Sequence, residues 1–286
     1  MTEFDLYAFA DYSGSKSEYQ QRKAIALSVI DNNKKQLYTD HTYTRESLRN
    51  FFIKILDKAS SEKKRVVFGF DHSYSFPVGF YDVVAGKKWE TWEQLLDLLC
   101  NSGQGLPQVK DGPREWAKAV NDLICKRLDL PKGPFWGPHF KDQLKNPEFP
   151  FKSFNMKEKR LVEERVPQTK PVYKIGGNGS VGLQSLYGIQ NLVEIQNKIR
   201  SRSELFCWPF DGWDLPSSGH VLVEIYPKLF NKKSKNHLQD AEACSEWFYE
   251  QDKKSMLLDR FDPNNLKLES ENELQQASLE GWIIGV

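Results

Sequence analysis

The sequence predicts an α/β protein with a mixed sheet that is flanked by helices and interrupted by a helical and loop insertion. Two short, largely apolar runs, residues 4–10 and 65–70, are each followed by an aspartate. Apolar side chains recur at helical spacing between them, over residues 44–59. Continuous apolar runs are typical of strands that are covered on both faces, as in α/β sheets. We therefore expect a single domain over residues 1–286.

The first part of the chain is expected to form a three-strand meander, a helix and a fourth strand. The strands are predicted at residues 4–10, 22–31 and 35–39, with a turn at Asn32 and Asn33 before the third. The helix at residues 44–59 follows, and the strand at 65–70 comes after it.

The alternation of apolar strands and helices stops over residues 77–168, which we predict to be an insertion or lid within the domain. Helices are expected at residues 92–100 and 113–128, and Pro113 suits the first turn of the second. The loops around them are rich in proline and aromatic residues, as in residues 133–138. Regular elements then return. They are predicted as strands at 172–175, 204–208 and 220–226, helices at 181–200 and 237–251, and a helix leading into residues 280–286.

Composition and charge exclude several classes of protein. The formal net charge is +1, so any basic surface for nucleic acid must be local. Such local surpluses occur at Lys228, Lys232, Lys233 and Lys235, and again at Lys152, Lys157, Lys159 and Arg160. The four cysteines are widely spaced and form no CxxC pair, which is typical of reduced thiols in a cytoplasmic protein. No stretch approaches the roughly 18 apolar residues of a membrane span, and no secretory signal is evident. We expect a soluble cytoplasmic protein with no membrane partner.

Four carboxylates are expected to gather at one edge of the sheet. Asp11, Asp71 and Glu224 lie at or near the ends of buried strands, and Asp240 lies on the following helix beside small alanines. Ligands of open α/β sheets bind at the carboxyl ends of the strands. Carboxylates that meet there repel one another unless a cation neutralises them, and sites built from oxygen ligands alone suit Mg²⁺ or Mn²⁺. Each acid taken singly is as well explained by a cap or an Asx turn.

The order of these elements resembles the RNase-H-like superfamily. More narrowly, short motifs resemble the family called domain of unknown function 429, and further motifs resemble its branch often labelled cobalamin-biosynthesis-like. The first set comprises residues 9–14, 68–71, 223–227 and 280–283. The second set comprises residues 170–173, 176–182 and 208–211.

This resemblance implies a metal-dependent nuclease. Members of the family are predicted nucleases of the RNase-H-like fold, so Asp11, Asp71, Glu224 and Asp240 would hold the metal ions. Two such ions hydrolyse phosphodiester bonds of DNA or RNA by activating a water and stabilising the leaving oxygen. The helix motif departs from the Asp-x-x-Asp form of RuvC-type relatives, which makes Glu242 an alternative to Asp240.

A glycine-rich turn and one histidine are further candidates for contacts with substrate phosphate. Residues 177–182 form a GxGxxG sequence between a predicted strand and a helix, a context that suits a dinucleotide pyrophosphate. No strand ending in an acid follows at about 20 residues, so a tight turn is the simpler interpretation. A third interpretation is that this segment and His72 contact a nucleic-acid phosphate, in which case the contacting residues would be Lys174, Gly177, Asn178, Gly179, Ser180 and His72.

Two other functions remain open at this point. Residues 11–15 are similar to the first phosphate loop of actin-like ATP-dependent phosphotransferases, although the segment after Asp71 lacks the glycine of a second one. The other alternative is a catalytically inactive binding protein that retains the fold, in which the four acids would lie too far apart to share a metal.

Some remaining acids and aromatic residues have two interpretations each. Glu163, Glu164 and Glu280 either add or orient metal ligands, or form surface salt bridges and terminus packing. The aromatic loops either stack unpaired bases or fill the core, and their residues are Phe135, Trp136, Trp208, Phe210 and Trp213.

Overall fold

A computed structural model describes the chain over residues 2–40, 42–101, 104–138, 140, 144–177, 179–200 and 204–286. Its strands are β1 (Leu6–Asp11), β2 (Ala26–Asp31), β3 (Gln36–Asp40), β4 (Val66–Phe70), β5 (Leu205–Cys207) and β6 (His220–Glu224). Its helices are α1 (Glu18–Ala24), α2 (Arg45–Ser61), α3 (Phe80–Ala85), α4 (Trp92–Cys100), α5 (Pro113–Leu128), α6 (Leu161–Arg165), α7 (Gly182–Ile199), α8 (His237–Lys253) and α9 (Glu271–Glu280).

The chain divides into two compact units. The first comprises Met1–His72, Glu194–Leu274 and Trp282–Val286, and it contains the sheet. The second comprises Ser73–Val193 and Gln275–Gly281, so it extends beyond the predicted insertion at residues 77–168 at both ends. The two units are described separately below.

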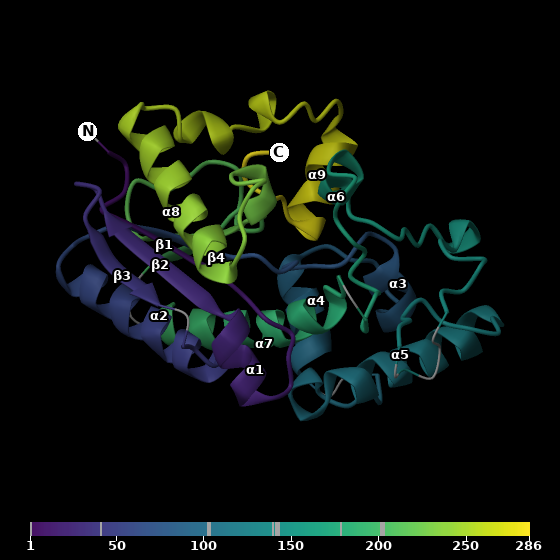
Figure 1. The fold of residues 1–286 in the computed structure, drawn as a ribbon. Helices are drawn as coiled ribbons and strands as arrows, with labels where there is room; N and C mark the ends of the chain where they lie inside the picture. Colours follow the sequence, from purple (N-terminus) through teal and green to yellow (C-terminus); the bar gives the residue numbers. More distant parts are fainter. Residues whose placement is uncertain are drawn as a thin grey trace. The chain divides into compact units, whose positions relative to one another are not determined.

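A mixed sheet of six strands forms the centre of the first unit, in the order β3-β2-β1-β4-β6-β5. β2 pairs antiparallel with both β1 and β3, which makes the predicted meander. β4 lies parallel to β1, β6 lies parallel to β4, and β5 lies parallel to β6. The predicted α/β class, with a mixed sheet and flanking helices, is therefore confirmed (Figure 1).

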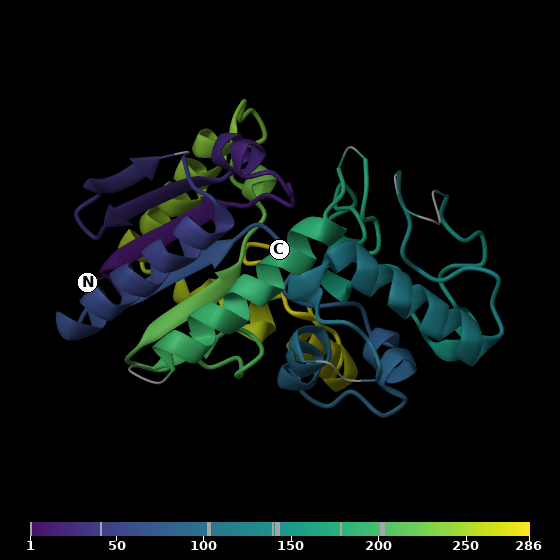
Figure 2. The ribbon, with the colours of Figure 1, turned by 90° about the horizontal axis from the view of Figure 1, so that it is seen from below.

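Helices cover both faces of this sheet, as the uninterrupted apolar strands required. Figure 1 shows α8 on one face, and Figure 2 shows α2 across the other. Because side chains alternate along a strand, β1 contributes Phe9 to the α8 face, where it stacks on Phe248 at 4.2 Å. On the α2 face, Phe68 of β4 lies 5.5 Å from Phe52 of α2.

The second unit is held together by aromatic packing among its helices and loops. Phe76, Phe80, Trp116, Phe135 and Tyr173 are all fully buried, and their rings pack within 4.3 to 6.4 Å of one another. Helices α4 and α5 have the bounds that their apolar spacing predicted. Shape-specific packing of large rings replaces a sheet as the core of this unit.

Two sequence predictions are wrong. Residues 22–24, predicted as the start of a strand, form the end of α1 instead, because acidic Glu18 and basic Arg22 sit at the helix ends that favour them and the apolar strand begins only at Ala26. The predicted strand at 172–175 forms a single bridge between Lys174 and Trp136, since a turn bond from the Lys174 N–H to Pro171 ends the extended run.

Short helices α3 and α6 were not predicted, because five or six residues are too few to show a periodicity. Within the described part of the chain, no helix combines the length and the apolar character that crossing a membrane requires.

Candidate metal centre

The edge of the sheet at the ends of β1 and β4 brings two of the predicted carboxylates together. Ala10 is the register partner of Phe70, so Asp11 and Asp71 follow side by side where the two parallel strands end. The backbone N–H of Tyr12 donates to Asp71 Oδ1 at 2.6 Å, which holds this carboxylate beside β1. Asp11 is 6 % exposed, because it lies on the face that α8 covers.

Helix α8 brings the third carboxylate, Asp240, to the same edge. The side chain of Asn236 caps the helix by accepting from the Gln239 N–H at 2.9 Å, and Asp240 lies in the first turn. Ala241 beside it is fully buried, so the helix start packs closely against the sheet. The side chains of Asp71 and Asp240 both influence the pKa of Asp11, so the three carboxyl groups lie close together. We call Asp11, Asp71 and Asp240 the acidic cluster.

Carboxyl groups this close repel one another when all of them are ionised. Burial and, after it, the negative charge of Asp240 raise the pKa of Asp11 to about 8, against the lowering effects of Asp71 and Lys228. Burial likewise raises the pKa of the Cys244 thiol on α8, and the three acids of the cluster add to this effect. The cluster is therefore a concentration of negative charge in a poorly solvated place.

Two basic side chains border the acidic cluster. His237 Nδ1 lies 3.0 Å from Asp11 Oδ2, and Lys228 Nζ lies 3.5 Å from Asp240 Oδ1. Asp240 Oδ1 is nevertheless buried, and among the described residues it has no hydrogen-bond partner. Lys228 and His237 are 44 % and 49 % exposed, so this border opens to solvent. The exposed residues Lys232, Lys233 and Lys235 lie between them in the sequence.

The fourth predicted ligand, Glu224, ends β6 and is 3 % exposed. It is the register partner of Phe70, whose ring packs on Phe52 of α2 at 4.8 Å. Register partners share a face, so strand alternation assigns Glu224 to the α2 face and Asp11 to the α8 face. The structure thus brings three of the four acids together, and a ligand role for Glu224 stays a prediction.

Two alternatives raised by the sequence, Glu242 and His72, make other contacts in the structure. Glu242, the possible substitute for Asp240, accepts instead from Thr39 Oγ1 on β3 at 3.0 Å. His72 is 2 % exposed and packs between the rings of Tyr12 and Phe70, at 5.0 and 5.8 Å. Such burial favours a packed loop histidine over one that contacts a phosphate.

The glycine-rich turn belongs to the second unit and closes on itself. The Ser180 hydroxyl and the Gly182 N–H both donate to the Lys174 carbonyl, at 2.8 and 2.9 Å. Gly177 and Gly179 have φ of +77° and +67°, a conformation that favours glycine. This geometry is that of a tight turn before α7. Asn178 lies outside the described residues, and phosphate contacts by this segment stay a prediction.

Two of the acids that the sequence left with two interpretations, Glu163 and Glu280, form a buried network with Arg160 in the second unit. Arg160 Nε donates to Glu163 Oε1 at 2.9 Å, and its Nη1 donates to the Glu280 carbonyl at 3.0 Å. The Glu280 carboxylate accepts from the Leu161 and Val78 N–H groups, both at 2.6 Å. Arg160, Glu163 and Glu280 are at most 2 % exposed, so Glu163 forms a buried salt bridge rather than a surface one.

The aromatic loops mostly fill the core. Phe135 and Trp208 are fully buried, and Trp213 packs edge-on against Trp208 at 5.6 Å. Neither of the two buried rings is available to stack a base.

Among the described residues, no group of three or more His, Cys, Asp or Glu side chains has a geometry already arranged to hold a metal ion. Comparison with models of protein families, with curated proteins and with solved structures finds no match to this chain.

Proposed function

We propose that this chain is a divalent-metal-dependent nuclease that hydrolyses phosphodiester bonds of DNA or RNA. The observation that carries the proposal is the convergence of Asp11, Asp71 and Asp240 from β1, the end of β4 and α8. Their separation along the chain means that only the folded state brings them together, in a buried place where they repel one another. Natural proteins keep such costly arrangements chiefly where function requires them.

Three features support a bound Mg²⁺ or Mn²⁺. The cluster offers carboxylate oxygens only, which are the ligands that these ions prefer. The buried Oδ1 of Asp240 lacks a hydrogen-bond partner among the described residues and so has a free lone pair for a ligand bond. The raised pKa of Asp11 marks a deficit of positive charge that a divalent cation would remove. Asp11, Asp71 and Asp240 would hold the cation, with Glu224 as the fourth predicted ligand.

A cation held there supplies the Lewis acidity that polarises a phosphate and lowers the pKa of a bound water. The chain itself supplies the rest. Lys228 stands at the open border of the acidic cluster, where its ammonium group attracts a substrate phosphate. His237 Nδ1 lies within hydrogen-bond distance of Asp11 Oδ2 and the side chain is half exposed, so it orients that carboxylate while it contacts solvent. The exposed lysines at 232, 233 and 235 extend this positive border.

The topology also supports the proposal. A three-strand antiparallel meander, followed across a helix by parallel strands beside β1, is the arrangement that the RNase-H-like resemblance implies. Under that resemblance the chain belongs with the domain of unknown function 429 family. We also propose a cytoplasmic location, since the four cysteines are widely spaced in the sequence and form no CxxC pair.

The two alternatives fit the geometry less well. An actin-like phosphotransferase needs a second glycine-bearing phosphate turn after Asp71, but His72 there is buried between two rings. An inactive binding protein would tolerate widely separated acids, but the side chains of Asp71 and Asp240 lie close enough to Asp11 to influence its pKa. Metal-dependent hydrolysis is the function that uses this proximity.

The test is a nuclease assay with Mg²⁺ and with Mn²⁺ on single-stranded, duplex and branched substrates. We expect cleavage by the wild type and a loss of at least about a hundredfold in Asp11→Asn, because a metal ligand is removed. Glu246→Gln, an exposed acid on the same helix, is the matched control and should cleave like the wild type. Equal cleavage by wild type and Asp11→Asn would contradict the proposal.

A further inference from the structure

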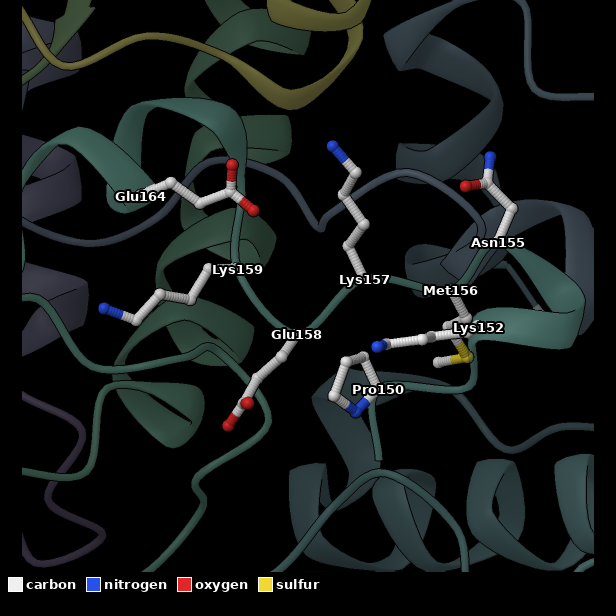
Figure 3. Close-up of a pocket in the computed structure, with 8 residues that line it drawn as sticks. All are labelled: Pro150, Lys152, Asn155, Met156, Lys157, Glu158, Lys159 and Glu164. Atoms are coloured by element: carbon white, nitrogen blue, oxygen red, sulfur yellow. The ribbon is translucent and has the colours of Figure 1, made fainter. Parts of the chain in front are cut away.

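A cavity of about 430 Å³ lies in the second unit, on the segment that precedes α6. Its volume falls within the roughly 300–1,000 Å³ of sites that bind small organic groups. Pro150 and Met156 provide apolar lining, and Met156 is 1 % exposed. The other lining residues are polar or charged, and Figure 3 shows them around the opening: Lys152, Asn155, Lys157, Glu158, Lys159 and Glu164.

The charge around this cavity is positive. Glu158 is neutralised by Lys145, whose Nζ lies 2.5 Å from Glu158 Oε2. Among the described residues, Lys152, Lys157 and Lys159 have no acidic partner within salt-bridge distance, so three free ammonium groups face one remaining acid, Glu164. An apolar floor beneath a cationic rim matches a ligand that is both flat and anionic.

The lysines do not converge on one point. In Figure 3 the ammonium group of Lys157 points upward, whereas those of Lys152 and Lys159 point to the left, and the three lie at separate places around the cavity. One isolated phosphate would contact only one of them, whereas the spaced phosphates of a strand would contact several. Phe154, in the same segment, is 42 % exposed and offers a ring on which a base can stack.

We infer that this cavity binds a nucleotide unit of a single-stranded nucleic acid, with the base against Met156 and Pro150 and neighbouring phosphates on the lysines. Basic side chains that track a backbone, together with an aromatic ring, are the features by which proteins bind unpaired strands. The inference deepens the proposed function by naming single-stranded nucleic acid, or single-stranded segments of it, as the substrate class.

The test measures binding of a labelled single-stranded oligothymidylate to the full chain by fluorescence anisotropy in EDTA, over a series of salt concentrations. We expect the triple variant Lys152→Gln, Lys157→Gln, Lys159→Gln to bind at least tenfold more weakly. We also expect the steepness of log affinity against log salt to fall by about two, because each phosphate contact of a single strand contributes about 0.7. Phe154→Ala should lose roughly fivefold or more in affinity with the slope unchanged.

The matched control is the triple variant Lys110→Gln, Lys118→Gln, Lys126→Gln, which removes the same charge from exposed positions of the same unit. Equal losses in both triple variants would overturn the inference, as would thymidine monophosphate binding as tightly as the oligonucleotide. Duplex DNA binding more tightly than the single strand would also overturn it.

Failure of this inference is distinguishable from failure of the proposed function. EDTA removes the metal, so binding reports on the cavity alone. Strong binding that depends on the lysines, without cleavage in Mg²⁺ or Mn²⁺, would leave the cavity in place and refute the nuclease. Cleavage in Mg²⁺ or Mn²⁺, together with oligothymidylate binding that the triple variant leaves unchanged, would support the nuclease and refute the role of the cavity.

Discussion

Two buried groups of carboxylates, one in each unit, differ in how their charge is compensated. In the second unit, Glu163 receives hydrogen bonds from Arg160, and Glu280 receives two from backbone N–H groups. In the first unit, the acidic cluster has only partly exposed Lys228 and His237 on its border, and one buried oxygen of Asp240 lacks a hydrogen bond among the described residues.

The pKa values of the two groups reflect this difference. Burial raises the pKa of Glu280 to about 7, but every other influence on it, from Leu161, Val78, Gln276 and Arg160, lowers it. For Asp11 the second influence after burial is a neighbouring carboxylate, which raises the pKa again, to about 8. In the second unit, protein groups alone compensate the buried carboxylates, as in a structural network. In the first unit, full compensation of the acidic cluster would require a bound cation.

The largest expected effect is on the complete network. Arg160→Met should lower the free energy of unfolding by about 3–5 kcal/mol, because it leaves Glu163 buried without its cation. Urea denaturation followed by circular dichroism measures the change. Lys118→Met, at an exposed position of α5, should stay within about 0.5 kcal/mol of the wild type. A loss of under about 1 kcal/mol for Arg160→Met would mean that the network is not structural.

A smaller effect, opposite in sign, is expected from the acidic cluster without metal. The folded protein raises the pKa of Asp11 from 3.8 to about 8, so it binds the proton more tightly than the unfolded chain. The resulting stabilisation is full below about pH 4 and is lost as the pH rises to about 8, by an amount on the order of a few kcal/mol. In EDTA at pH 9, Asp11→Asn should therefore be more stable than the wild type by about 2–4 kcal/mol.

Thermal or urea unfolding of both proteins at several pH values in EDTA measures this difference. Below pH 4 the two proteins should converge. If Asp11→Asn proves less stable than the wild type at pH 9, then the carboxylate is compensated inside the protein and the contrast between the two units disappears.

The smallest expected effect concerns the border of the cluster. Lys228→Gln should change the free energy of unfolding by less than about 1 kcal/mol, because the Lys228–Asp240 pair is partly exposed. It should nevertheless weaken cleavage, since the positive charge at the open border is lost. Lys253→Gln, at the far end of α8, is the control. Unchanged cleavage by Lys228→Gln would exclude a role for this lysine in holding phosphate.

The sequence predicted most of the sheet, because long apolar runs and clear helical periodicity mark β1, β4, α2 and α8. It missed α1, whose residues are polar and mostly exposed, and its strand at 172–175 was wrong because buried turns also contain apolar runs. Because Asp11 and Asp71 stand at the ends of two predicted strands, the sequence correctly predicted that they lie side by side.

Other parts of the site depend on three-dimensional packing. That Asp240 approaches Asp11 follows from how α8 packs on the sheet, which spacing alone does not determine. The contact of His237 with Asp11 was missed, although its place one turn before Asp240 on α8 was a usable signal. Glu224 was predicted from its strand end, but register decides on which face such a residue lies.

The most direct test of the central claim is Mn²⁺ binding by the acidic cluster, measured by isothermal titration calorimetry at pH 6 and pH 9 in buffers of different ionisation enthalpy. We predict binding to the wild type that tightens from pH 6 to pH 9, with proton release at pH 6, because Asp11 must lose its proton to bind metal. Asp11→Asn and Asp240→Asn should lose binding, whereas Glu246→Gln should keep it. Binding that is absent, or equal in wild type and Asp11→Asn, would contradict the account.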